Sequence, residues 1–520
     1  MANITKESMK IKFLKSSILI FLILFTNENI LSQEKEITIE CSIENIENSF
    51  SESLLFARQD ESEKIFVVQK IYRNSSTPKG YYIKRFSDKL LLEDRSQIDL
   101  ENNEIRGMYV NDTKIFLIQF EYSRESKAYL LNLLSSSKTT FNFKKSLLFS
   151  IDRQDIDKYE MFGENEKSAF PNKEDFISGG NLVSSDNGKY HCYSVRLKRK
   201  ESSKNLFLIF DENFNLITQN IYEDSGKGNV LINEISVTND GKIYFLSKKY
   251  EKTIPISKIV PGVQDYKIQL HTLFNGNFKE INISESGLLG GSAFITTNDV
   301  YSSIVGFYSN KENTMFSSAG YSGVFVFDLN HSNNEISNFN KYNFTEFLSN
   351  KREKPVNKIQ NYLAFKDIYT ENESLIFNSE VHYTDGGNNA CMHYGNILSI
   401  KFNKNGELNW VNTINKDQEA CFGWGKTYKY SFVSLYDSSE IYYVSNYDFE
   451  NNIDLDKDVN SLCNVLKLNT VNNTESIFKL SRRKASEIYF KNYVQINNQL
   501  IITEGIDNNG NPSLIKLSLQ

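Results

Sequence analysis

Apolar and polar residues alternate along most of this chain in short runs that end at polar turns. The segment "GNILSIKFNKNGELNWVNTINKDQ", residues 395–418, shows the basic unit, because two runs with period-two apolar spacing flank Asn405-Gly406. Asn-Gly between two such runs is a strong signal for a β-hairpin. Other runs, such as "KIYFLSK" and "LFLIF", are apolar on both faces. That pattern is typical of strands in sheets that are covered on both sides.

Two kinds of hairpin alternate eight times along the chain. The first kind joins a strand to the next through a short polar turn, at 59–70, 111–122, 185–195, 238–248, 297–309, 371–383, 437–447 and 497–505. The second kind follows each of these, at 81–94, 128–143, 205–218, 266–283, 323–339, 397–414, 465–480 and 513–519. Each pair predicts four antiparallel strands, A to D, which is the content of one β-propeller blade.

The two ends of the chain predict how the ring closes. The last unit has strands A, B and C but stops at Gln520, so its strand D is missing. A lone strand pattern, "EITIECSI" at 36–43, has no hairpin partner nearby. Pairing it with 513–519 would complete the last blade and leave no open sheet edge. We therefore predict an all-β fold, a propeller of eight four-stranded antiparallel blades closed by the N-terminal strand. Seven blades is the alternative, if the weak first unit is miscounted.

The N-terminal segment has the features of an export signal. Lys10, Lys12 and Lys15 precede the apolar run "SSILIFLILF" at 16–25, and polar residues follow it. The run is about half of the roughly 20 residues that a membrane-spanning helix needs. We expect a signal peptide at 1–32, cleaved between Ser32 and Gln33, and a single propeller domain at 33–520. We expect the mature chain to have no membrane span and to reach the periplasm or the extracellular space.

Composition and charge narrow the classes of function. A net charge of -6 and a pI near 5.7 argue against nucleic-acid binding, which needs a basic face. Gly406 and Trp410 resemble a quinoprotein docking repeat, but the chain has only two Trp, so the pattern cannot recur on every blade. We therefore expect no quinone and no other cofactor. With 65 Asp and Glu, carboxylate pairs arise by chance and support no catalytic assignment. We expect a monomer.

Six long segments are predicted to lie on one face of the propeller. A-B and C-D turns are short, whereas the long segments all connect B to C or D to the next A, at 147–180, 249–265, 309–323, 345–361, 382–395 and 415–429. In an antiparallel meander these connections share one face. Loops longer than about 12–15 residues are usually functional or disordered. Because tolerated insertions would not select one side, we predict that this face binds a ligand.

Two of these segments, 382–395 and 415–429, carry the richest candidate chemistry. Cys391 and Cys421 can form a disulfide, remain separate thiols or hold a metal ion. The Cys-Met-His spacing is not a recurring zinc motif, and export favours oxidation of paired thiols. We favour the disulfide and assign no metal, and we expect Cys192 to be a buried thiol. The candidate binding residues are His382, Tyr383, Asp385, His393, Tyr394, Phe422 and Trp424.

Three stretches carry a resemblance to known sequences. "SVTNDGKIYFLSKKY", "SSIVGFYSN…GVFVFDL" and "GNILSIKFNKNGELNWVNTINKDQ" resemble a group of uncharacterised, exported β-propeller-like proteins of Bacteroidota. The resemblance covers roughly residues 180–418, and its motifs are mainly structural. It implies the fold and a location in the periplasm or beyond, but no activity. The Cys-bearing segments depart from the pattern of the group.

Two functions fit these observations. The first is an exported non-catalytic binding or scaffold propeller that recognises a protein, a peptide or a glycan on the face with the long segments. The second is a glycan-active hydrolase or lyase on the same scaffold. A glycosidase would need two carboxylates about 5–9.5 Å apart at the channel mouth. A binding protein would need an aromatic, charge-poor patch. We favour the binding protein and assign no catalytic residue.

Overall fold

The structure is a computed structural model of the chain. It describes residues 36–42, 51–72, 78–99, 103–156, 180–198, 203–224, 226, 228, 230–250, 266–283, 288–289, 292–309, 321–348, 363–371, 374–384, 391–421, 429–454, 461–481 and 485–520. The predicted signal peptide at 1–32 lies outside these residues. No helix within the described ranges is long and apolar enough to cross a bilayer.

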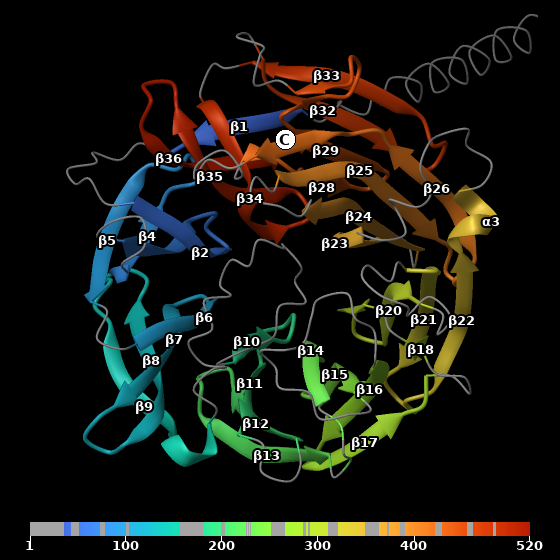
Figure 1. The fold of residues 1–520 in the computed structure, drawn as a ribbon. Helices are drawn as coiled ribbons and strands as arrows, with labels where there is room; N and C mark the ends of the chain where they lie inside the picture. Colours follow the sequence, from blue (N-terminus) through green and yellow to red (C-terminus); the bar gives the residue numbers. More distant parts are fainter. Residues whose placement is uncertain are drawn as a thin grey trace, which may run out of the picture.

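The described strands form eight blades around a ring (Figure 1), which confirms the predicted all-β propeller with eight rather than seven blades. Blade one contains β2 (Ser51–Gln59), β3 (Ile65–Tyr72), β4 (Pro78–Phe86) and β5 (Leu92–Asp99). Blade two contains β6 (Asn103–Val110), β7 (Lys114–Ser123), β8 (Ala128–Ser137) and β9 (Lys144–Asp152), followed by a 3-10 turn at Arg153–Asp155. Blade three contains β10 (Asn181–Ser184), β11 (Tyr190–Leu197), β12 (Ser203–Asp211) and β13 (Leu216–Asp224).

The next three blades follow the same order. Blade four contains β14 (Val230–Val237), β15 (Ile243–Tyr250), β16 (Tyr266–Phe274) and β17 (Asn277–Ile281), and the short β18 (Leu288–Leu289) also pairs with β16. Blade five contains β19 (Ser292–Thr297), β20 (Tyr301–Tyr308), β21 (Gly323–Asn330) and β22 (Ile336–Asn343), before helix α3 (Phe344–Leu348). Blade six contains β23 (Leu363–Glu371), β24 (Ser374–Thr384), β25 (Cys391–Phe402) and β26 (Leu408–Ile414), and β27 (Gln418–Cys421) also pairs with β25.

The last two blades complete the ring. Blade seven contains β28 (Val433–Asp437), β29 (Glu440–Ser445), β32 (Ser461–Asn469) and β33 (Glu475–Ser481), with the small hairpin β30 (Tyr447–Asp448) and β31 (Ile453–Asp454) between β29 and β32. Blade eight contains β34 (Ala485–Asn497), β35 (Leu500–Asp507), β36 (Pro512–Leu519) and, from the other end of the chain, β1 (Ile37–Cys41).

The N-terminal strand closes the ring as predicted. β1 pairs antiparallel with β36, from Ile37 opposite Leu519 to Cys41 opposite Ile515. Figure 1 shows β1, the first described strand, in blade eight together with β36, the last. Lys516 Nζ lies 3.1 Å from Glu40 Oε2 across this pair. The last blade therefore gains its strand D from the start of the chain, and β1 covers the edge of β36.

The hydrophobic core lies between neighbouring blades. One cluster joins Leu246 and Leu270 of blade four to Ile304 and Phe327 of blade five, all of them fully buried. Apolar residues on both faces of each middle strand make this packing possible, which explains the continuous apolar runs in the sequence. Cys192 is buried and outside any disulfide, as predicted. Burial raises the pKa of its thiol well above the usual value.

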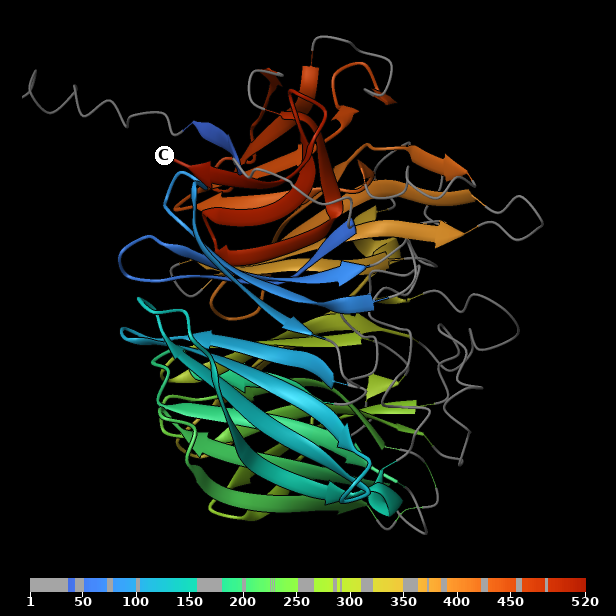
Figure 2. The ribbon, with the colours of Figure 1, turned by 90° about the vertical axis from the view of Figure 1, so that its left-hand side faces the viewer.

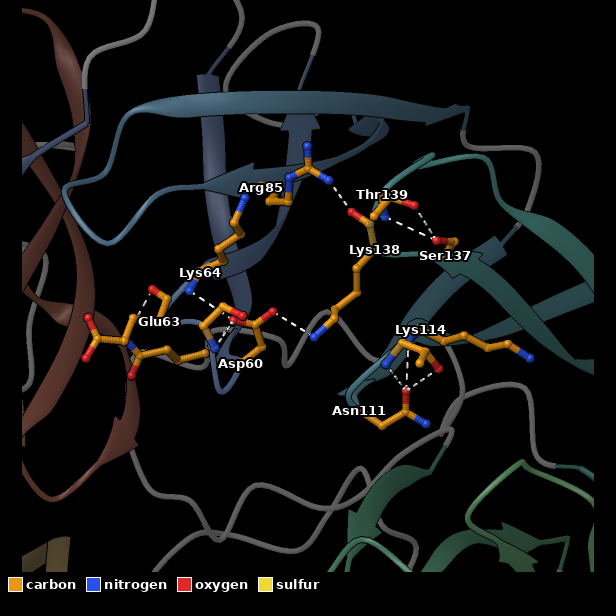
Figure 3. A network of polar contacts seen from close by, with 12 residues as sticks. Asp60, Glu63, Lys64, Arg85, Asn111, Lys114, Ser137, Lys138 and Thr139 are labelled. Atoms are coloured by element: carbon orange, nitrogen blue, oxygen red, sulfur yellow. Dashed lines mark hydrogen bonds and ion pairs between the residues drawn. The ribbon is translucent and has the colours of Figure 1, made fainter.

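The short A-B and C-D turns lie together on one face of the ring. Figure 2 shows the ring from the side, with short hairpin turns on its left-hand side. Figure 3 shows how they connect two blades: Lys138 Nζ of blade two lies 2.7 Å from Asp60 Oδ2 of blade one, and Arg85 donates to the Lys138 carbonyl. These two turns are therefore fastened to each other, although several of their residues are exposed to solvent.

These contacts follow a rule that repeats around the ring. A backbone carbonyl at the start of a C-D turn accepts a hydrogen bond from a basic side chain of the preceding blade. Lys401 Nζ donates to the Thr470 carbonyl over 3.3 Å, and Lys516 Nζ donates to the Asp88 carbonyl over 2.6 Å. Trp410 Nε1 also donates to the Thr470 carbonyl, over 3.0 Å. The Trp that resembled a cofactor-docking motif is therefore part of the contact between blades six and seven.

Candidate functional site

Blade six carries the two predicted Cys-bearing segments, and its middle strands are longer than the sequence suggested. β24 extends to Thr384, and β25 begins at Cys391. The sequence predicts a loop over 382–395, and this prediction is wrong at both ends, because 382–384 pair with 392–394 and 391–394 also pair with β27. β27 continues the sheet where β26 has ended. Only 385–390 remain between the strands, and these residues lie outside the described part of the chain.

The β-strand period of two divides the candidate binding residues between two faces of this ribbon. Tyr383 lies opposite His393, and His382 lies opposite Tyr394. Because successive side chains point to opposite faces, the two pairs point in opposite directions. Tyr383 and His393 are half-buried, whereas His382 and Tyr394 are buried. Asp385, Phe422 and Trp424, the other candidates, lie outside the described residues.

We call the side of the ribbon that carries Tyr383 and His393 its outward face, and the side that carries His382 and Tyr394 its inward face. The outward face carries an aromatic pair next to a disulfide. The rings of Tyr383 and His393 are stacked, with centroids 4.4 Å apart and an interplanar angle of 10°. Cys391 and Cys421 are directly opposite each other on β25 and β27 and are joined by a disulfide. Glu419 is exposed and lies opposite His393 on the same face. The face therefore presents two stacked aromatic rings with a carboxylate beside them.

The inward face leads to a cluster of buried charges between blades six and seven. Glu380 of β24 is inaccessible to solvent, and its Oε1 lies 2.7 Å from Lys416 Nζ. Its Oε2 accepts a hydrogen bond from Ser431 Oγ over 2.6 Å and lies 4.0 Å from Lys366 Nζ. Lys366 Nζ donates to Ser431 Oγ over 2.9 Å, and Lys416 Nζ donates to the Tyr394 carbonyl over 3.0 Å. Each charge therefore has a close partner.

A β-bulge explains how Lys366 reaches this cluster. The pairing of β23 with β24 shifts between Phe365 and Asp367, so Lys366 is the extra residue in the inner strand. A bulge bends the strand and redirects one side chain. The inner strands β2, β6 and β14 shift at the matching place, but only blade six has a lysine there with Glu380 beside it. Blade two has Arg106 at the equivalent bulge, ion-paired with Glu104, so a basic bulge residue is shared by two blades, and the fully buried carboxylate partner Glu380 belongs to blade six.

The electrostatics of the cluster keep Glu380 ionised and His382 neutral. Burial opposes ionisation of Glu380, but Lys416, Lys366 and two hydrogen bonds outweigh it and lower the pKa of the carboxyl. Burial lowers the pKa of His382 to about 4, although Glu380 acts in the opposite direction. A carboxylate held by two ammonium groups away from solvent is a poor proton acceptor. The cluster therefore supports the ribbon rather than providing a general base.

Two buried polar atoms beside the cluster make no hydrogen bond within the described part of the chain. They are Tyr394 Oη and Gln418 Nε2, and their residues lie opposite each other on β25 and β27. Gln418 Oε1 accepts from the Ser431 amide over 3.2 Å, which helps to hold Ser431 at a φ of 90°. Buried polar groups normally have partners, so water or a ligand atom can be accommodated here.

Sequence reasoning missed four residues of this site: Lys366, Glu380, Lys416 and Ser431. One signal was available, because Glu380 lies within "SLIFNSEVHY", a predicted middle strand of a blade, and such strands are covered on both faces. A carboxylate in the middle of such a strand needs a buried cation as its partner. The partner itself was not predictable, because Lys416 is distant along the chain and only the blade geometry brings it to Glu380.

Comparisons with known proteins concern the fold. No protein-family model matches the chain, and no curated protein matches it. The similar solved structures include the β-propeller domain of the Trilobed protease from Pyrococcus furiosus, with 10% identity, a TM-score of 0.37, and coverage of 82% of this chain and 95% of that chain. The Pyrococcus horikoshii acylaminoacyl peptidase has 9% identity and a TM-score of 0.35 over 76% of this chain, which spans 58% of the peptidase chain.

A third similar structure is the Penicillium chrysogenum alpha-L-arabinanase complexed with arabinobiose. It has 11% identity and a TM-score of 0.30, with coverage of 63% of this chain and 88% of that chain. At these identities and scores the three similarities carry no argument about activity, substrate or partner. The chain is a β-propeller scaffold, and its function has to be argued from its own residues.

Proposed function

We propose that this chain is an exported, non-catalytic binding propeller that recognises a glycan on the face with the long connections. The observation that carries the proposal is the Tyr383–His393 pair, which is stacked at 4.4 Å and half-buried on the outward face of the blade-six ribbon. The two rings are parallel and overlap, so each covers one face of the other, and the remaining partly negative ring face and the ring edges form a small aromatic surface. The C–H face of a sugar ring fits such a surface, and Glu419 beside it can accept hydrogen bonds from sugar hydroxyls.

The rigidity of the ribbon supports this role. The Cys391–Cys421 disulfide links its outer strands, and the Glu380 cluster fastens its inward face to blade seven. A preorganised surface loses little conformational entropy when a ligand binds, so more of the contact energy appears as affinity. The sequence hypothesis that Trp424 adds an aromatic anchor belongs to the same proposal.

Export is part of the proposal and has its own test. The Cys391–Cys421 disulfide supports it, because disulfides persist mainly in oxidising compartments outside the cytosol. We expect the mature protein to begin at Gln33. Mass spectrometry of the exported protein measures this directly, and a mature chain that retains residues 16–25 would refute a cleaved signal.

A glycan array followed by calorimetric titration of the full chain tests the binding function. Tyr383→Ala should weaken binding about 30-fold, which corresponds to the roughly 2 kcal/mol of an aromatic hot spot. His393→Ala should also weaken it. Tyr190→Ala is the matched control, because Tyr190 is half-buried at an A-B turn of blade three, on the opposite face. Unchanged affinity in Tyr383→Ala, or equal losses in Tyr190→Ala, would contradict the proposal.

The same protein samples also test the two alternative functions, peptide recognition and glycan cleavage. A peptide array incubated with the same proteins distinguishes peptide recognition from glycan recognition. Chromatography of the glycans after incubation reports cleavage, so a glycan-active hydrolase or lyase would be detected as released products. We expect bound, intact glycans. No binding on the glycan array, with or without cleavage products, would overturn the non-catalytic glycan-binding proposal.

A further inference from the structure

The outward face of the β25–β27 ribbon groups three metal-binding side chains. The sulfur atoms of Cys391 and Cys421 and a carboxylate oxygen of Glu419 all lie within 4.8 Å of one another. Glu419 Oε1 is 2.9 Å from Cys421 Sγ. Two sulfurs and one carboxylate form a donor set that suits Zn²⁺, which binds thiolate, imidazole and carboxylate ligands in a tetrahedron. In the disulfide state the sulfurs are bonded to each other, so that set is not available.

We propose that reduction of the disulfide converts this face into a binding site for a thiophilic divalent cation, with Zn²⁺ as its representative. Cys391 and Cys421 supply thiolates, Glu419 supplies one carboxylate oxygen, and the fourth position is open to water. The site is redox-gated: the oxidised chain excludes the cation and the reduced chain binds it. The inference does not need glycan binding to occur, although the metal site would share Glu419 with the proposed glycan surface.

The backbone holds the three ligands together without the disulfide. Met392 pairs with Ala420, and Tyr394 pairs with Gln418, so the ladder continues on the inner side of the cysteine pair. Tyr394 and Ala420 also pack with Tyr430 in a small buried cluster on the inward face. The Cα atoms of the two cysteines are 4.0 Å apart. In a tetrahedral site with Zn–S bonds of about 2.3 Å, the sulfurs are about 3.8 Å apart, which side-chain rotation can provide.

The chemistry needs a reductant and releases protons. Cys421 is exposed, so a soluble reductant can reach its sulfur. A phosphine attacks that sulfur, the S–S bond breaks, and Cys391 leaves as a thiolate. Water then hydrolyses the phosphonium adduct, which gives the second thiol and the phosphine oxide. The phosphine loses two electrons and the disulfide gains them. Binding of Zn²⁺ to the two thiols releases two protons and forms two Zn–S bonds.

His393 is not part of the proposed ligand set. Its ring is stacked on Tyr383 at 4.4 Å, and it is absent from the group of donor atoms within 4.8 Å. Metal binding therefore leaves the aromatic pair in place. A His393→Ala variant should lose glycan affinity and keep metal affinity, whereas Glu419→Gln should lose metal affinity in the reduced state. The two variants separate a failure of this inference from a failure of the proposed function.

The experiment titrates the full chain with Zn²⁺, using a competing chromophoric chelator, before and after phosphine reduction and anaerobic removal of the phosphine. We expect one equivalent to bind only after reduction. Cys391→Ser and Cys421→Ser should each bind at least 100-fold more weakly, and Glu419→Gln about 10- to 100-fold more weakly. Circular dichroism of the reduced chain, without metal, should show the same β-sheet signal at room temperature. Its melting should remain a single transition, with a lower midpoint.

Several results would overturn the inference. These are no binding by the reduced chain, equal binding by the oxidised chain, and unchanged binding by either Cys→Ser variant, which would indicate an adventitious surface site. Loss of β-sheet signal on reduction would also overturn it, because the site depends on a ladder that persists without the disulfide. Glu419→Gln retains both cysteines, so its effect remains interpretable if a Cys→Ser variant fails to fold.

Discussion

A lysine that recurs near the end of strand C forms polar contacts between neighbouring blades. The sequence shows a basic residue before an apolar one near the end of strand C, as in Ile400-Lys401-Phe402 and Ile515-Lys516-Leu517. The structure gives this repeat a physical reason, because Lys401 and Lys516 donate to the second carbonyl of the C-D turn in the following blade. Lys467 occupies the same position in blade seven but pairs with Glu440 of its own blade, at 2.8 Å. Blade eight takes its strand D from the N-terminus and has no C-D turn to offer.

This difference predicts unequal effects of two matched substitutions. Lys516→Met removes a hydrogen bond to the Asp88 carbonyl and the ion pair with Glu40, both between distant parts of the chain. We expect it to lower the free energy of unfolding by about 2 kcal/mol, the value for hydrogen bonds to charged groups. Lys467→Met is the control, with similar burial and a partner within its own blade. Denaturant titration that gives equal losses for both variants would refute a special role in ring closure.

The buried carboxylate of blade six leads to a second prediction. Glu380→Gln removes the negative charge that neutralises Lys416 and Lys366, and both ammonium groups are buried. An uncompensated buried charge typically costs about 3–5 kcal/mol. We expect a loss of stability of that size, measured by chemical denaturation. Glu419→Gln, which changes an exposed carboxylate of the same blade, should stay within about 0.5 kcal/mol of the wild type. A Glu380→Gln variant as stable as the wild type would show that the cluster is dispensable.

At the scale of elements, the sequence predicted the blades well because each strand ends at a clear turn. Asn405-Gly406 is such a turn, and Gly406 has a φ of 73°, a conformation that favours glycine. A Cβ there would also approach the Asn338 carbonyl to 2.6 Å, so the turn fits closely against blade five. Local turn chemistry and strand alternation are enough to define this hairpin, and they recur in every blade.

The candidate site was predicted less completely, for physical reasons. The sequence predicts a loop at Cys391–Tyr394 because apolar and polar residues do not alternate there. In the structure the burial does not alternate either: Cys391 and Tyr394 are buried, and the two residues between them are half-buried. The short β27 has no periodicity of its own and exists because it pairs with β25. Such elements are determined by tertiary contacts, which a local pattern does not contain.

Strand β1 is the element on which ring closure depends. Five residues, Ile37 to Cys41, pair with β36, and Ile37 is buried against blades seven and eight. Deleting 33–42 removes this ladder and exposes the edge of β36. Loss of the Ile37 contacts alone costs more than about 2 kcal/mol, and the lost backbone pairing adds to it. We expect a clearly lower melting temperature than for a chain that lacks only 1–32. Equal melting temperatures for the two truncated chains would reject closure by β1.

For the whole molecule, the contacts between turns and the proposed recognition surface lie on opposite faces of the ring. Contacts between turns of consecutive blades lie on the A-B and C-D face, and they include Lys138–Asp60, Lys401–Thr470 and Lys516–Asp88. The Tyr383–His393 pair, where β24 leads towards β25, belongs to the other face. Exposed side chains of the proposed recognition face can therefore be changed with little loss of stability, whereas the buried Glu380 cluster under the same ribbon cannot. This separation is what makes the matched variants Tyr383→Ala and Tyr190→Ala informative.

Acid sensitivity is a property of the whole ring, because buried neutral histidines occur in several blades. Burial lowers the pKa of His191, His271 and His382 to about 4 in the folded chain. In the unfolded chain the pKa of histidine is about 6.5. Between pH 6.5 and pH 4 the unfolded chain therefore binds more protons than the folded chain. The stability that these histidines provide is fully present above pH 6.5 and is lost as the pH falls towards 4.

We expect the free energy of unfolding to fall by about 2 kcal/mol for each of these histidines when the pH is lowered from 7 to 5, because the pKa of the histidine is lower in the folded than in the unfolded chain. His191 stacks on Phe214 with centroids 4.3 Å apart, so His191→Phe can keep the aromatic packing while removing the titrating group. It also loses the contact of Nδ1 with Ser184 Oγ, which lowers stability at both pH values. Urea titrations at pH 7 and pH 5 should therefore show a smaller pH effect in His191→Phe, by about 2 kcal/mol. An identical pH effect in the variant and the wild type would show that His191 does not contribute to acid unfolding.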